Sequence, residues 1–491
     1  MLFTSATFAF LYLPVVLIGF FLAGRRAPAA AALWLFGASL FFYGYWMPEF
    51  TLLLLASITG NFVVAQRIAS HRGHARLWLI AGITLNLGLL AYFKYANFFL
   101  DNLNAVLRLD WKMARVVLPI GISFYSFTQI AYLVDTWQGK VNEVRPVHYG
   151  LFVTYFPHLI AGPVLHHAQM MPQFANPAVY RFNGAHFSAG MAIFCIGLFK
   201  KVVLADGVAP YADAVFGPVD GGAHPGHAEA WIGALAYTLQ LYFDFSGYSD
   251  MAVGLSWMFN IRLPFNFDSP YKAISISDFW RRWHISLSTF LRDYLYVPLG
   301  GNRKGAVRRY INLGLTMVLG GLWHGANWSF VLWGTLHGLY LMVNHGFRAT
   351  TRRLGWQAAL DASRVAKVAA WALTMLAVVV AWVFFRAETL PGAVRMLQAM
   401  AGRVPAATDP GLLLWNAGLQ APVAAGWCIA MGAAAAWLPN SNRIGEILLG
   451  WTGRQPQWTA ALAGAATAGA IALVLLNTTR SSVSAFIYFN F

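Results

Sequence analysis

Two histidines stand out in a chain that is otherwise strongly apolar. His284 lies in the polar segment 277–288 together with two arginines and an aspartate, and His324 lies in the apolar, glycine-rich segment 319–326. Burial in apolar surroundings disfavours the charged imidazolium, and a neutral imidazole can act as a general base toward a hydroxyl group. A histidine that only forms hydrogen bonds between helices is the alternative interpretation.

Basic residues gather on both sides of His284. Guanidinium groups bind phosphates and carboxylates, so this cluster is a candidate clamp for an anionic, phosphate-bearing donor. The alternative is a positively charged loop that faces anionic lipid headgroups. His284 is also placed to pair with Asp278 or Asp293, for catalysis or as a structural ion pair. The cluster comprises Arg281, Arg282, Arg303 and Lys304, with Lys272 and Arg292 nearby.

The other histidines and the cysteines do not form a recognisable metal motif. The sequence contains no HExxH and no CxxC pattern, and the adjacent His166 and His167 cannot both face one point from a helix. We therefore expect no metal site. Cys195 and Cys428 both lie in apolar runs, which indicates small core residues and no disulfide framework.

The chain ends in an aromatic hexapeptide, residues 486–491. Four of its six residues are aromatic, and Tyr488 supplies its only hydroxyl group. Aromatic residues are common where a protein meets the membrane interface, so an interfacial belt is one interpretation. A functional interpretation needs support beyond composition.

The elements that must position these groups are membrane helices. The 491 residues are 58% hydrophobic and only 11% charged, whereas soluble domains carry about 25% charged residues. Apolar runs of about 20 residues recur along the chain, without the alternation of a membrane β-barrel. We expect an all-α polytopic integral membrane protein with about 10–12 transmembrane or re-entrant helices. Ionisable groups inside such a protein are costly and are retained mainly where they function.

The net charge of +16 indicates orientation in the membrane and not a nucleic-acid partner. Most Lys and Arg residues fall in short loops, where they mark the cytoplasmic side. Arg25 and Arg26 follow the first apolar run, so we expect a retained first helix that starts outside. Counting spans from there also places the tail 477–491 outside.

Two segments depart from simple spans. Residues 119–134 are apolar but interrupted by Ser, Thr and Gln, which indicates contact with protein and not with lipid. Residues 155–164 contain two prolines and a glycine, which break a helix. Broken backbone at membrane depth is tolerated only where it is buried or lines a cavity.

At these residues the sequence resembles the membrane-bound O-acyltransferase (MBOAT) family, in particular its bacterial branch of alginate and related polysaccharide O-acetyltransferases. The matching segments include both histidine segments and follow in order over roughly residues 1–390. They are residues 118–125, 156–163, 240–251, 279–288, 299–304 and 320–326.

The resemblance implies a helical domain, residues 1–485, around a tunnel through the membrane, with acetyl-CoA as the acyl donor on the cytoplasmic side. His324 matches the catalytic histidine of the family, and His284 matches a second polar position. Residues 486–491 are similar to an acyl-transfer motif in which the tyrosine, here Tyr488, accepts the acyl group transiently. The basic cluster would then hold the donor.

The resemblance also implies a location and a partner. We expect a bacterial inner-membrane protein with periplasmic termini, which passes acetyl to a periplasmic SGNH-type acetyltransferase or another acetyl-accepting protein. The final acceptor would be an exported polysaccharide of the alginate or cellulose type, and peptidoglycan or another envelope glycan is the alternative. A transporter or flippase of a lipid-linked sugar is the alternative from another class, but it predicts paired broken spans in two halves, which we do not find.

Overall fold

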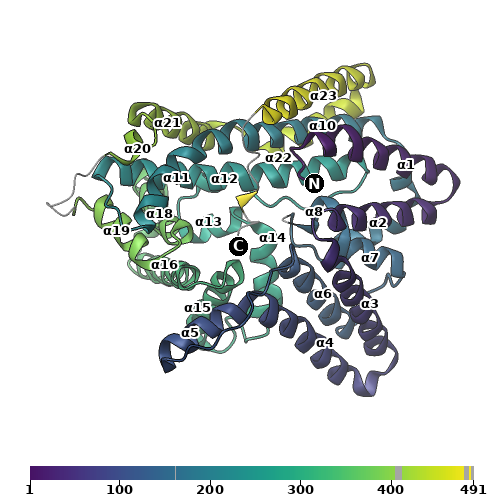
Figure 1. The fold of residues 1–491 in the computed structure, drawn as a ribbon, viewed down its shortest axis with the longest axis horizontal. Helices are drawn as coiled ribbons and strands as arrows, with labels where there is room; N and C mark the ends of the chain where they lie inside the picture. The colour runs from purple at the N-terminus through teal and green to yellow at the C-terminus, as the bar shows by residue number, and fades with distance from the viewer. Residues whose placement is uncertain (161, 404–411, 480–485, 488–491) are drawn as a thin grey trace. The chain divides into compact units, whose positions relative to one another are not determined.

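The computed structural model describes residues 1–160, 162–403, 412–479 and 486–487. The chain divides into two compact units, which are described separately. The first unit holds Met1–Phe199, Gly247–Phe265 and the segment that starts at Ser441, and the second holds Lys200–Ser246 and Asn266–Asn440. Within the described ranges, all regular secondary structure is helical (Figure 1).

Six helical segments are long and apolar enough to cross a membrane. The bent pair α21 (Ala421–Trp437) and α22 (Ser441–Arg454) makes a seventh among the described residues if it counts as one span. Most other helices are shorter or more polar, and the all-helical prediction is confirmed. The six segments are Thr7–Arg26, Pro48–Ser70, Ala75–Leu107, Gly184–Asp220, Arg364–Arg386 and Gln457–Thr478.

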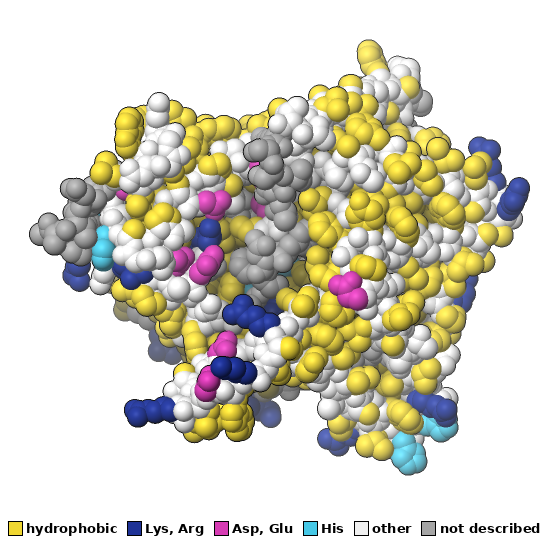
Figure 2. Space-filling model, viewed as in Figure 1, with side chains coloured by type: hydrophobic (Ala, Val, Ile, Leu, Met, Phe, Trp, Pro, Cys, Tyr) yellow, Lys and Arg dark blue, Asp and Glu magenta, His cyan; other side chains and the backbone are white. Residues whose placement is uncertain are grey.

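Large hydrophobic side chains lie on the outside of both units. Leu52 in the first unit is 75% exposed, and Val365 in the second is 80% exposed. Figure 2 shows hydrophobic side chains over much of the face in view. Exposed apolar surface on this scale is typical of contact with lipid or with another apolar partner.

The first unit is built from helices of both chain ends. The π-helical turn Thr7–Tyr12 leads directly into α1, and the π-helical turn Ala91–Tyr95 connects α4 to α5. Its other helices are α1 (Leu13–Arg26), α2 (Pro28–Gly44), α3 (Pro48–Ser70), α4 (Ala75–Leu90), α5 (Ala96–Leu107), α6 (Ile122–Trp137), α7 (Pro146–Thr154), α8 (Phe156–Leu159), α9 (His167–Ala175), α10 (Gly184–Phe199), the end of α12 (His227–Met258), α22, α23 (Pro456–Thr478) and the short turns Arg72–His74 and Pro177–Tyr180.

A buried polar network joins four helices of the first unit. Asn86 on α4 donates to Asn61 on α3 at 2.7 Å, and Gln129 on α6 donates to Ser57 on α3 at 2.9 Å. The Tyr149 hydroxyl on α7 donates to Gln129 at 3.2 Å. Hydrogen bonds of this kind join helices inside membranes. The expectation that residues 119–134 face protein is confirmed.

The chain between α7 and α8 is broken and buried, as expected for residues 155–164. The backbone N–H of Phe156 donates to Ser39 Oγ at 3.2 Å, and the His158 ring lies 3.1 Å from the Phe152 carbonyl oxygen. These bonds satisfy polar groups that the helix break would otherwise leave without partners.

Both ends of the chain reach the part of α12 that belongs to the first unit. The buried Tyr248 ring on α12 stacks on Phe486 with ring centroids 4.5 Å apart, and on Phe3 at 5.0 Å. Tyr488, the proposed acyl acceptor, lies outside the described residues.

The second unit carries both histidines of interest. Helices α16, α18 and α19 lie side by side in it (Figure 1). Its helices are α11 (Asp206–Asp220), the first part of α12, α13 (Ile276–Arg282), α14 (Ile285–Leu291), α15 (Gly305–His324), α16 (Trp328–Arg353), α17 (Gln357–Ala362), α18 (Arg364–Arg386), α19 (Leu390–Met400), α20 (Leu413–Asn416), α21 and the short turns Lys200–Ala205, Pro270–Lys272 and Arg292–Tyr296.

The carboxylates of α12 have structural partners. In the second unit, Lys201 Nζ lies 2.8 Å from Asp206 and 2.9 Å from Asp244, and all three side chains are buried. In the first unit, Asp250 accepts a hydrogen bond from Ser441 Oγ at 2.9 Å. These contacts tie α12 to its neighbours within each unit.

Candidate active site

His284 occupies the turn between α13 and α14 in a left-handed backbone conformation, with φ 45° and ψ 53°. A non-glycine residue rarely adopts this conformation, and it persists where the surroundings impose it. The backbone N–H of Ile285 donates to the Asn266 carbonyl oxygen at 3.0 Å, and that of Asp268 donates to the Arg282 carbonyl oxygen at 2.9 Å. The segment that starts at Asn266 therefore holds the turn on both sides of His284.

The Asn266 side chain also fixes the His284 ring. Asn266 Oδ1 accepts hydrogen bonds from the backbone N–H and the hydroxyl of Ser286, and it lies 3.2 Å from His284 Nδ1. Because Oδ1 can only accept, His284 Nδ1 carries the hydrogen, and Nε2 carries the lone pair. His284 lies outside the six candidate spans, and burial lowers the pKa of its imidazole to about 3. The ring is therefore neutral at physiological pH.

His324 is the last residue of α15 and lies in an aromatic box. Its ring centroid is 5.0 Å from Trp323, 5.1 Å from Trp333 and 5.2 Å from Phe385. The side chain is 3% exposed, so the box excludes bulk water. The His284 ring lies 6.4 Å away. The structure thus brings together the two histidines that the sequence singled out.

Close packing of α15 against α16 sets the position of His324. A methyl group on Gly321 would overlap the Phe330 carbonyl oxygen, and one on Gly334 would overlap the Met317 carbonyl oxygen. These obstacles are backbone atoms, which cannot rotate away as a flexible side chain can. The glycines of segment 319–326 are therefore needed for the approach that carries His324 to Trp333.

Two buried donors beside the histidines have no hydrogen-bond partner among the described residues. They are Asn266 Nδ2 and Trp333 Nε1. Buried polar groups are nearly always hydrogen-bonded, so an exception indicates a place for a ligand or water. Sequence reasoning did not identify either residue, because Asn266 and Trp333 meet the histidines only through the fold.

A third histidine also contacts Trp333. His337 is fully buried, its ring centroid is 4.9 Å from that of Trp333, and its Nδ1 accepts a hydrogen bond from Trp280 Nε1 at 3.2 Å. Sequence reasoning assigned His337 no role, because it was one of the histidines that form no recognisable metal motif. Within the described part of the chain, no group of three or more His, Cys, Asp or Glu side chains could hold a metal ion.

The predicted pairing of His284 with Asp278 or Asp293 is wrong. Asp278 pairs with Arg282 at 3.1 Å and with Arg281 at 3.5 Å, and Asp293 pairs with the neighbouring Arg292 at 2.7 Å. An arginine is the stronger partner for a carboxylate, and the left-handed turn directs the His284 ring to Asn266 instead.

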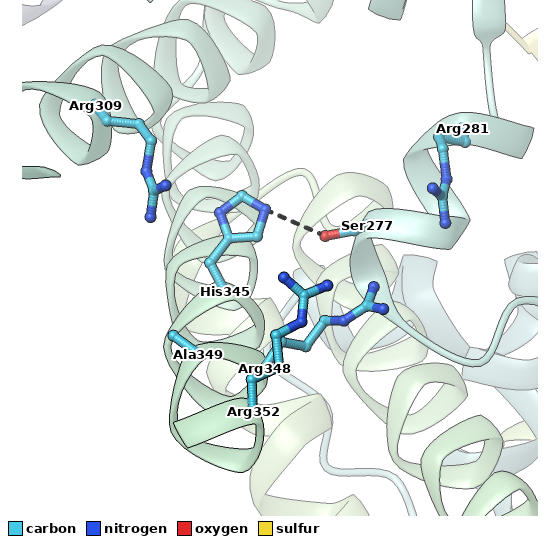
Figure 3. Close-up of a pocket in the computed structure, with 7 residues that line it drawn as sticks. All are labelled: Ser277, Arg281, Arg309, His345, Arg348, Ala349 and Arg352. Carbon is cyan, nitrogen blue, oxygen red and sulfur yellow. Dashed lines mark hydrogen bonds between the residues drawn. The ribbon is translucent and has the colours of Figure 1, made fainter. Parts of the chain in front are cut away.

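The predicted donor clamp is divided in the structure. Arg281 lines a cavity together with arginines of α15 and α16 (Figure 3). Arg282 pairs with Asp278 and does not line this cavity. Arg303 and Lys304 lie exposed in the turn before α15, also outside the cavity lining.

Comparison with known proteins identifies the family. The sequence model described as MBOAT, membrane-bound O-acyltransferase family, matches residues 82–385, a range that includes both histidines. The chain belongs to this family. It is therefore a multi-pass membrane acyltransferase, as the sequence resemblance indicated.

Relatives match this MBOAT chain over different shares of its length. The peptidoglycan O-acetyltransferase of Helicobacter pylori is 43% identical over 431 residues, which cover 82% of this chain and 80% of the relative. The probable alginate O-acetylase of Pseudomonas aeruginosa is 45% identical over 408 residues, which cover 82% and 75%. The teichoic acid D-alanyltransferase of Bacillus subtilis is 26% identical over 245 residues, 48% of this chain and 61% of the relative.

Proposed function

We propose that this MBOAT protein transfers acetyl groups from cytoplasmic acetyl-CoA across the bacterial inner membrane for O-acetylation of an exported polysaccharide. The alginate or cellulose type is our first choice of acceptor, and peptidoglycan is the alternative, because relatives of both kinds share more than two-fifths of their residues with this chain over the matched length. The observation that carries the proposal is the pair of buried histidines within the family match.

His324 is the general base in this proposal. The accepting hydroxyl gives its proton to the His324 imidazole as its oxygen attacks the thioester carbonyl carbon. Collapse of the tetrahedral intermediate breaks the carbon–sulfur bond, and the proton passes to the leaving thiolate. General-base catalysis of this kind typically contributes a factor of about 10² to 10⁴ in rate.

His284 and the two unpartnered donors complete the site. A separation of 6.4 Å between the ring centroids is too long for a direct hydrogen bond between the histidines. In this proposal His284 Nε2 accepts a hydrogen bond from a reacting polar group. Asn266 Nδ2 or Trp333 Nε1 would stabilise the negative charge that develops on the thioester oxygen.

Tyr488 is the proposed first acceptor. A phenol, with an ordinary pKa of about 10, releases its proton to imidazole more readily than a sugar alcohol does. The acetyl ester would then pass to a periplasmic SGNH-type partner, which divides one difficult transfer into easier steps. Phe486, two residues before Tyr488, stacks on Tyr248 of the first unit. In this proposal both termini lie in the periplasm.

Polymer acetylation in cells tests the proposed function. A strain in which His324→Ala replaces the wild-type protein should export polysaccharide with acetyl content at background, while the membrane level of the protein is unchanged. His74→Ala, which removes an exposed histidine, is the matched control and should behave as wild type. Wild-type acetyl content in the His324→Ala strain would exclude His324 as the base.

A further inference from the structure

Three helices of the second unit direct basic side chains into one cavity of about 350 Å³. Helix α13 contributes Arg281, α15 contributes Arg309, and α16 contributes His345, Arg348 and Arg352. Figure 3 shows the guanidinium groups arranged around the His345 ring. Ser277 and Ala349 complete the lining.

Three of the four arginines of this cavity have no carboxylate partner among the described residues. Among the described residues, no carboxylate lies within ion-pair distance of Arg309, Arg348 or Arg352. Asp278 lies 3.5 Å from Arg281 and binds Arg282 more closely, at 3.1 Å. Guanidinium groups held together in this way repel one another unless an anion lies between them.

The arrangement differs from an ordinary basic loop at the membrane surface. Arg309 and Arg348 are half-buried, whereas Arg281, Arg352 and the neighbouring Arg308 and Arg353 are exposed. The Arg309 guanidinium lies over the Tyr310 ring at 4.5 Å and donates to the Tyr310 hydroxyl at 2.6 Å. A charge that only marks the cytoplasmic side needs no such ordering.

We propose that the arginine cavity is a binding site for a phosphate ester. Planar guanidinium groups hold phosphate oxygens with two parallel hydrogen bonds, and three or more of them suit a dianion better than a single carboxylate. Arg309, Arg348 and Arg352 hold the phosphate, and Arg281 lies at the edge of the site. Ser277 helps to position His345: its hydroxyl donates to Asn344 Oδ1 at 2.8 Å and lies 3.5 Å from His345 Nε2.

The cavity is connected to the histidine pair through α16. Trp333, which contacts His324, and His345, which lines the cavity, are on this one helix, about 18 Å apart along its axis. An extended chain covers about 3.5 Å for every three bonds, so the roughly fourteen bonds of a pantetheine thioester cover about 16 Å. The phosphate of a CoA-type acyl donor is therefore one source, and this assignment rests on the proposed function. An anionic lipid headgroup is the other source.

Binding to the purified full-length chain tests the site. Titration calorimetry in a non-ionic detergent would measure the dissociation constants of coenzyme A and of inorganic pyrophosphate. We expect at least one of these dissociation constants to rise about tenfold or more in each of the variants Arg309→Gln, Arg348→Gln and Arg352→Gln, since each loses a charge-assisted hydrogen bond. Arg308→Gln and Arg353→Gln remove the same charge from exposed neighbours and should change neither constant more than about twofold.

A lipid-binding measurement distinguishes a CoA-type phosphate from a lipid headgroup. Nanodiscs that contain phosphatidylglycerol would be used to count lipids that stay bound to the protein in native mass spectrometry. Loss of bound lipid in the three cavity variants, with coenzyme A affinity unchanged, would assign the site to a headgroup. If the cavity variants bind coenzyme A, pyrophosphate and lipid as well as the control variants do, the proposal is overturned.

Two further measurements distinguish loss of the site from misfolding and from failure of the proposed function. Arg348→Lys retains the charge without the planar fork and should bind more weakly than wild type but more tightly than Arg348→Gln. Failure of the proposed function would appear as a protein that binds coenzyme A through the arginine cavity but never takes up label from acetyl-CoA. If the cavity variants are labelled normally and bind coenzyme A as the wild type does, the arginine cavity is not the binding site, but the proposed function is not contradicted.

Discussion

Residue by residue, the candidate site is built around a neutral histidine in a strained turn. A left-handed residue other than glycine costs about 1–3 kcal/mol, which the surrounding contacts must offset. Asn266 provides them, because its backbone carbonyl and its side chain both bind the turn that carries His284. The same hydrogen bonds place the ring hydrogen of His284 on Nδ1. They therefore account both for the left-handed conformation and for the lone pair on Nε2.

His284→Asn tests the role of Nε2 without removing the turn. Asparagine tolerates the left-handed conformation, and its amide can still donate to Asn266 Oδ1. We expect acetyl transfer to fall by about 10² to 10⁴, while the elution profile and the melting temperature change little. Activity within a few-fold of wild type would show that the His284 Nε2 atom is not needed.

The neutral His284 also predicts an effect of pH on stability. The unfolded chain protonates this imidazole below about pH 6.5, whereas the folded protein does so only near pH 3. The unfolded state therefore binds more protons between these values, and stability is lost as the pH falls from about 6.5 toward 3, by at most about 1.4 kcal/mol per pH unit.

Melting curves of the wild type and of His284→Asn over pH 7 to 4.5 measure this effect. The wild type should lose stability more steeply, since every other titrating group is shared by the two proteins. Parallel curves would mean that His284 is protonated in the folded state in this range.

Sequence alone was enough to mark His324 and His284, because polar groups are conspicuous in an apolar chain. It could not mark Asn266 or Trp333, which are an ordinary polar and an ordinary aromatic residue until the fold brings them to the histidines. The predicted partner of His284 was wrong for the same reason. Asp278 and Asp293 are close to His284 in sequence, but in the structure they pair with arginines.

At the scale of elements, contact between α15 and α16 positions His324. Gly334→Ala would place a methyl group against the Met317 carbonyl and 3.2 Å from the Gly321 Cα atom. The helices must then separate, and a displacement of about 1 Å at a catalytic group costs about a hundredfold in rate. We expect Gly334→Ala to lose most acetyl transfer and some thermal stability.

Gly346→Ala is the matched control on the same helix. No atom lies within 4 Å of the methyl group it would add, and alanine favours a helix over glycine by up to about 1 kcal/mol. Acetyl transfer should be unchanged and the melting temperature equal or higher. Equal loss of activity in both variants would refute the close-packing explanation.

The elements themselves differ in how far sequence predicted them. Apolar runs of about 20 residues indicated membrane helices such as α3, α18 and α23, since hydropathy alone determines that such helices form in a membrane. The 32 residues of α12 were not predicted as one helix, because carboxylates and hydroxyls interrupt the apolar pattern. Partners such as Lys201 and Ser441, which lie far from them in sequence or in another helix, satisfy those groups.

For the whole molecule, the sequence indicated the class of protein but not its internal division. The two compact units interleave along the chain, so that α12 begins in the second unit and ends in the first. No boundary was predicted at these crossings, and one of them lies inside the single helix α12. The family match covers residues of both units, and the proposed transfer from Tyr488 requires the full chain.

Covalent labelling by radioactive acetyl-CoA tests the central claim most directly, that acetyl passes to the C-terminal tyrosine with His324 as the base. Purified wild type, His324→Ala, Tyr488→Phe and the control His74→Ala would be compared. We predict acetyl label on the wild type and on His74→Ala and none on the other two, because one lacks the base and the other lacks only the accepting hydroxyl. Equal label on all four proteins, or on none of them, would contradict the account.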